Sequence, residues 1–213
     1  IPKAPRCKNW EKTDFKIDDF KDQDNIGLKL KEHTDIDIDH QICLPFIDKY
    51  IQPCSATFGR VNLPKAMHLL FKRKSKFKKF ALHKDLEKYF KNNPHGANII
   101  ECRSGVDKQT IVPGSLVDGQ KPGEGVSIEW KVLDGISPYP GDLYEDTCKV
   151  AFASALSIIY PSTGGRDDYT YAIACILAKN TEWQDFEIDN FIEHLAENSS
   201  DDESRSGKGT HAF

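Results

Sequence analysis

The chain has 213 residues, of which 38% are hydrophobic and 29% charged, and its formal net charge is −4. This size and composition are typical of a globular protein with one large domain, or a medium and a small one. No apolar run approaches the roughly 20 residues that a membrane span needs, and we expect no membrane partner. The six cysteines are scattered without a CxxC pair. We therefore expect reduced thiols, a cytoplasmic location and no zinc site.

Most strand patterns lie in the first two thirds of the chain. Alternating or apolar runs predict short strands over residues 25–31, 34–39, 66–72, 97–103, 109–112 and 126–132. Gly-rich turns separate several of these runs, and helical segments are expected between others. Strands with helices between them predict an α+β or α/β domain that ends near residue 140.

Basic residues are concentrated in the middle of the chain. From Arg60 to Lys91 there are 11 Lys or Arg residues and two acids. This asymmetry favours a basic face for a polyanion, although a solvated helix face would look similar. The stretch up to Lys91 is predicted to be mostly helical and to stop at the Asn-Asn-Pro sequence of residues 92–94.

The last third of the chain has a different periodicity. After Gly141, apolar residues recur at the spacing of an amphipathic helix. Three such patterns predict three short helices, around residues 148–159, 169–177 and 188–195. Together they predict a small helical domain over residues 141–213.

The most informative stretch is an acidic strand. Asp35, Asp37 and Asp39 alternate with isoleucines, so a strand would place the three carboxylates on one face. Three like charges on one face repel each other unless a cation binds there. Alternate residues lie about 6–7 Å apart, so neighbouring aspartates can share a metal site but the outer two cannot. The working pair is therefore Asp35 with Asp37, or Asp37 with Asp39. The alternative is an exposed edge strand whose charges prevent aggregation.

Three further residues could complete a site with these aspartates. Glu101 and Arg103 would share one face of their strand, a carboxylate for a metal beside a guanidinium for a phosphate. His68 lies on another predicted strand, and Arg60 is expected in a glycine-containing turn before it. A salt-bridged surface arginine and a structural histidine are the ordinary alternatives.

The order of these motifs resembles a known family. It runs from Asn-Ile-Gly-Leu at 25–28 through the Asp-x-Asp strand and Phe-Gly-Arg at 58–60. His-Leu-Leu-Phe-Lys at 68–72 and Ile-Ile-Glu-Cys-Arg-Ser-Gly at 99–105 follow. In this order the chain is similar to the catalytic domain of the archaeo-eukaryotic primase superfamily, in particular the bifunctional primase–polymerase domains of plasmids, phages and other mobile elements.

The resemblance implies a fold. Residues 1–140 would form an α+β (α/β) primase–polymerase catalytic domain, built on a mixed sheet flanked by helices. Residues 141–213 resemble the small helical domain that often follows in primases. The location would be the cytoplasm of a prokaryotic host.

The resemblance also implies a reaction, template-directed nucleotidyl transfer by a DNA primase and polymerase. Asp35, Asp37 and Glu101 would hold two divalent ions, Mg²⁺ or Mn²⁺, with Asp39 in a supporting position. The phosphates of a dNTP or NTP substrate would be bound by Arg60, His68 and Arg103. Contacts to the backbone of a single-stranded DNA template are expected from the basic segment of residues 72–79, chiefly from Lys72, Arg73, Lys74 and Lys76. The sequence leaves open whether a helicase domain or a separate helicase works with the chain.

Two other functions remain as alternatives. One is a non-catalytic replication-initiation or DNA-binding module with the same fold, although such a module has no need for a costly cluster of carboxylates. The other is a metal-dependent nuclease, which would leave Arg60, His68 and Arg103 without a triphosphate to bind.

Overall fold

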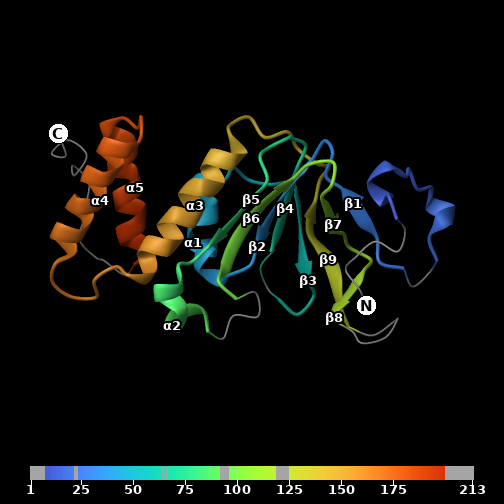
Figure 1. The fold of residues 1–213 in the computed structure, drawn as a ribbon, viewed down its shortest axis with the longest axis horizontal. Coiled ribbons are helices and arrows are strands. Elements are labelled where there is room, and N and C mark those ends of the chain that lie inside the picture. Colours follow the sequence, from blue (N-terminus) through green and yellow to red (C-terminus); the bar gives the residue numbers. More distant parts are fainter. Residues whose placement is uncertain are drawn as a thin grey trace.

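A computed structural model describes residues 8–21, 24–63, 65, 67–91, 96–118 and 125–199. The fold is α+β: a large antiparallel sheet carries helices on one face, and a small two-stranded sheet lies at its other side (Figure 1). The expected α+β class is therefore present. Among the described residues, no helix is long and apolar enough to cross a membrane. The described cysteines are free thiols.

The large sheet has seven strands in the order β5-β6-β2-β4-β3-β9-β8. Its strands are β2 (Thr34–Ile38), β3 (Ala56–Arg60), β4 (His68–Phe71), β5 (Lys78–Ala81), β6 (Asn98–Ser104), β8 (Leu116–Asp118) and β9 (Gly125–Leu133). Every pairing of neighbours is antiparallel, so the expectation of a mixed sheet is wrong. For β3 and β4 this follows from their connection, because a short link returns the chain in the antiparallel direction. The small sheet pairs β1 (Gly27–Lys29) with β7 (Gln109–Ile111).

The described residues form five α-helices, and those after residue 141 begin three to five residues before their predicted ranges. They are α1 (Leu44–Tyr50), α2 (Glu87–Phe90), α3 (Leu143–Ile158), α4 (Arg166–Asn180) and α5 (Asp185–Asn198). The three predicted C-terminal helices, α3 to α5, are confirmed. Asp142 fixes the start of α3, because its side chain accepts hydrogen bonds from the backbone N–H groups of Tyr144 and Glu145 at 3.0 and 3.2 Å.

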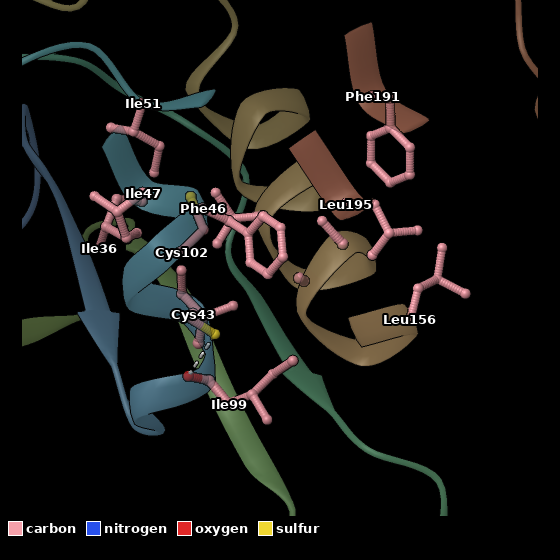
Figure 2. Close-up of a cluster of buried hydrophobic side chains, with 14 of the residues drawn as sticks. Ile36, Cys43, Phe46, Ile47, Ile51, Ile99, Cys102, Leu156, Phe191 and Leu195 are labelled. Atoms are coloured by element: carbon pink, nitrogen blue, oxygen red, sulfur yellow. Dashed lines mark hydrogen bonds between the residues drawn. The ribbon is translucent and has the colours of Figure 1, made fainter. Parts of the chain in front are cut away.

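The main hydrophobic core lies between the sheet and the helices. Helix α1 packs between β2 and β6 on one side and α3 and α5 on the other (Figure 2). Ile36 of β2, Phe46 of α1 and Leu195 of α5 belong to one buried cluster. The core is thus continuous across residue 140, and the boundary between residues 1–140 and 141–213 stays a prediction. A second, smaller cluster around Phe58 and Leu70 fills the opposite face of the sheet.

Two local predictions are wrong. The basic stretch is not mostly helical: residues 73–77 have no regular structure, β5 is a strand, and α2 spans four residues. Among the strands that the structure describes, β5 pairs with β6 alone. Lysines are common on such edge strands because their charge opposes pairing with another chain. Arg60 is the last residue of strand β3 and does not lie in a turn. The strand was not predicted because Ala56, Thr57 and Phe58 are all buried, so β3 lacks the alternation of polar and apolar residues.

Candidate active site

Strand β2 separates apolar from acidic side chains, as its alternation predicts. Ile36 and Ile38 face the main core, so Asp35 and Asp37 lie on the opposite face of the sheet. Both aspartates are buried, with 0% and 6% of their surface exposed. β2 is an interior strand between β6 and β4, so the alternative of an exposed edge strand is wrong.

The strand order brings the other predicted residues to the same face. Asp37 is the direct cross-strand partner of Glu101 on β6 and of His68 on β4. Asp35 is the partner of Arg103, one step further along β6. Direct partners in an antiparallel sheet have their side chains on the same side, close enough to interact. The predicted carboxylates, His68 and Arg103 therefore form one cluster, which we call the carboxylate site: Asp35, Asp37, His68, Glu101 and Arg103.

Arg103 contacts all three carboxylates. Its Nε donates to Oε2 of Glu101 at 3.0 Å, and its Nη1 lies 3.7 Å from Oδ2 of Asp35. Its Nη2 donates to Oδ2 of Asp37. One guanidinium with three different nitrogens thus neutralises acids from two neighbouring strands.

His68 supports the same aspartates from β4. Its Nδ1 lies 3.1 and 3.2 Å from the two carboxylate oxygens of Asp35, and 3.5 Å from Oδ1 of Asp37. The imidazole stacks on Phe58 of β3, with ring centroids 4.6 Å apart and an angle of 5° between the planes. Phe58 is fully buried, so it fixes the plane of the histidine ring.

The electrostatics of Asp35 follow from these contacts. Burial alone would raise the pKa of Asp35, but the charges of His68 and Arg103 and the hydrogen bond from His68 outweigh it. The net result is a pKa below the usual value for an aspartate. Asp35 is therefore an ionised carboxylate at neutral pH, despite its burial.

Lys79, at the end of the predicted basic segment of residues 72–79, also belongs to this site. It is the direct partner of Glu101 across β5 and β6, and its Nζ lies 2.6 Å from Oε1 of Glu101. About half of the Lys79 side chain is exposed. Because the basic stretch was predicted to be helical, the pairing of Lys79 with Glu101 was not predicted. A strand prediction for residues 78–81 would have placed this lysine on an edge strand.

Arg60 and Asp39 lie one step beyond the cluster. Arg60 follows Phe58 by two residues on β3, so it shares the face that carries His68. Asp39 comes directly after β2 and is buried, and its backbone N–H donates to the carbonyl of Ile99 at 3.0 Å. The roles predicted for Arg60 and Asp39 stay predictions.

The basic segment of residues 72–76 crosses the end of the sheet next to the Asp35–Arg103 pair. Its predicted DNA contacts, Lys72, Arg73, Lys74 and Lys76, are all exposed. The backbone of this segment is anchored to both neighbouring strands: Thr34 Oγ1 donates to the carbonyl of Arg73 at 2.6 Å, and the Ser75 N–H donates to Ser104 Oγ at 3.1 Å. Thr34 and its partner Ser104 lie on the face of the sheet that carries Ile36, which is opposite to the carboxylate site. Lys76 Nζ lies 5.2 Å from the ring centroid of Tyr144 in α3, so the segment is anchored toward the helices.

The donors of the site are of the type that hard divalent cations prefer. Three buried carboxylates on two adjacent strands suit Mg²⁺ or Mn²⁺ rather than zinc, which favours nitrogen and sulfur. Within the described ranges, no three His, Cys, Asp or Glu side chains are already arranged around a shared metal position. Arg103 lies among the carboxylates in this structure, so a metal ion would require it to move.

Comparisons of the chain with protein-family models, with curated proteins and with solved structures found no match. Any functional assignment therefore depends on the carboxylate site itself.

Proposed function

We propose that the chain is a template-directed nucleotidyltransferase of the primase–polymerase type. One observation carries the proposal: three buried carboxylates, Asp35, Asp37 and Glu101, meet on one sheet face beside Arg103 and His68. Removing three carboxylates from water is costly, and folding alone does not require it. Clusters of this kind are concentrated at functional sites.

The acidic residues would hold the divalent ions. Asp35, Asp37 and Glu101 supply only oxygen donors, as Mg²⁺ and Mn²⁺ require. When bound, two such ions would activate the attacking 3′-hydroxyl and neutralise the pyrophosphate that leaves. The chain itself contributes a fixed position for the carboxylates, because β2 and β6 are paired along five residue pairs.

The cationic residues would bind the triphosphate of a dNTP or NTP. Arg103 offers a planar fork of donors that matches phosphate oxygens. His68 is held by its stacking on Phe58, which would orient a donor toward the same substrate. Arg60, on the same face of the sheet, would reach the phosphates from β3.

The direct test is incorporation of labelled nucleotide on single-stranded DNA, with and without a primer, in Mg²⁺ or Mn²⁺. We expect a template-dependent product from the wild type and none from Asp35→Ala/Asp37→Ala, because the ions would lose most of their ligands. Asp48→Ala, at an exposed position of α1, is the matched control and should retain activity. Product formed without a primer would show that the chain also has primase activity. Absence of product, together with absence of metal-dependent nucleotide binding, would contradict the proposal.

The basic segment would contact the DNA backbone without reading sequence. Lys74→Gln/Lys76→Gln should weaken binding of single-stranded DNA and reduce the slope of log K against log salt by about 0.7 per lost contact. Fluorescence anisotropy of a labelled oligonucleotide at several salt concentrations measures this. Lys49→Gln removes a lysine that pairs with Glu197 between α1 and α5, and it should leave the slope unchanged. An unchanged slope in Lys74→Gln/Lys76→Gln would show that Lys74 and Lys76 do not contact the DNA backbone.

One observation favours a second candidate, a non-catalytic DNA-binding module with this fold. Each of the three carboxylates already pairs with Arg103, and Glu101 also pairs with Lys79. Such a closed network could serve structure alone. DNA binding without metal-dependent nucleotide binding would select this candidate.

A further inference from the structure

The carboxylate site carries its own counter-cation. Arg103 uses Nε, Nη1 and Nη2 on Glu101, Asp35 and Asp37 respectively. These contacts occupy one oxygen of each carboxylate: Oε2 of Glu101 and Oδ2 of both aspartates. The other oxygens face His68 Nδ1 or Lys79 Nζ, so a divalent ion that bound all three carboxylates would meet Arg103 at the oxygens it holds. A divalent ion and Arg103 would therefore compete for the same carboxylate oxygens.

We propose that Arg103 is an internal counter-cation that competes with divalent metal for Asp35, Asp37 and Glu101, and so weakens metal binding in the resting protein. This inference rests on the proposed function, because it concerns the same site. If so, removal of the positively charged Arg103 from the site should increase the affinity for a divalent ion.

The burial of each group indicates which one can move. The side chains of Asp35 and Glu101 are 0% and 5% exposed and are fixed on central strands, whereas that of Arg103 is 24% exposed. His68 is held against Phe58 by ring stacking. Arg103 is thus the member of the cluster that can leave toward solvent while the carboxylates stay in place.

The Arg103 guanidinium is held in the site by ion pairs to carboxylates of β2 and β6. It can leave only by exchanging the carboxylates for water or for another anion. A triphosphate is an anion whose oxygens match the guanidinium fork. The arginine that neutralises the empty site would therefore become available to the substrate when metal takes its place.

The test is the affinity for Mn²⁺ alone, followed by electron spin resonance of the free ion, for wild type, Arg103→Gln and Lys49→Gln. We expect Arg103→Gln to bind Mn²⁺ about tenfold or more tightly than wild type, because a unit charge a few ångströms from the ion is removed. Lys49→Gln lies away from the site and should match wild type. Adding Asp37→Asn to Arg103→Gln should abolish the gain, which assigns it to the carboxylate site.

Folding of the variant is followed in parallel by thermal unfolding in EDTA and in saturating Mn²⁺. Arg103→Gln should unfold at a lower temperature than wild type in EDTA, since its buried carboxylates lose a partner, and Mn²⁺ should raise its midpoint more than that of wild type. If the variant is unfolded in EDTA, recovery of the fold in Mn²⁺ supports the proposal, and failure to recover overturns it.

The outcomes separate this inference from the proposed function. Equal or weaker Mn²⁺ binding by a folded Arg103→Gln, with clear binding by wild type, would overturn the competition and leave the proposed function standing. Absence of Mn²⁺ binding in both proteins would overturn the two together.

Discussion

Glu101→Gln should reduce nucleotide incorporation by roughly 10²- to 10³-fold, the loss typical when one electrostatic contact to a transition state is removed. The substitution preserves the shape of the side chain and removes its charge. Glu101 lies opposite Asp37 on β6, so the site would lose one of its three carboxylates without a change in backbone position. The readout is the rate of labelled nucleotide incorporation in Mg²⁺ and in Mn²⁺.

The fold should survive this substitution. Arg103 keeps its contacts to Asp35 and Asp37, and Lys79 is half exposed and can be hydrated. Circular dichroism and the unfolding midpoint should therefore remain close to those of wild type. Glu197→Gln, at an exposed position of α5, is the matched control with full activity. A Glu101→Gln protein with wild-type rates would remove Glu101 from the proposed machinery.

Phe46→Ala should lower the free energy of unfolding by about 3–5 kcal/mol, the range for truncation of a buried aromatic residue. Phe46 is 1% exposed and lies where α1 meets α3 and α5 (Figure 2). Loss of the ring leaves a cavity between the sheet and the helices, and close-packed surroundings fill such a cavity only in part. Chemical denaturation at constant protein concentration measures the change.

Phe186 offers a matched control for this experiment. It is also a helical phenylalanine, near the start of α5, but 65% of its surface is exposed. Phe186→Ala should change the free energy of unfolding by no more than about 0.5 kcal/mol. Equal losses from Phe46→Ala and Phe186→Ala would show that the core does not lie between α1 and the C-terminal helices.

Local periodicity was enough to predict several features of this protein. The alternation around Asp35 and Asp37 predicted both the strand and the common face of the two carboxylates, because successive side chains of a strand point to opposite sides. The spacing of apolar residues predicted α3, α4 and α5, because each buries a single face. These signals are contained within short windows of the chain. Each of residues 35, 37, 68, 101 and 103 could therefore be identified as a candidate site residue from its own neighbours in the sequence.

Only the tertiary structure decided how these residues meet. That β6 and β4 flank β2, and so bring Glu101 and His68 to Asp37, depends on pairing between segments far apart in the chain. The same pairing made residues 78–81, predicted to be helical, an edge strand and brought Lys79 to Glu101. Strand order and direction depend on backbone hydrogen bonds and on burial across the whole sheet. No short window of sequence contains that information, so the charge balance of the site could be read only from the folded chain.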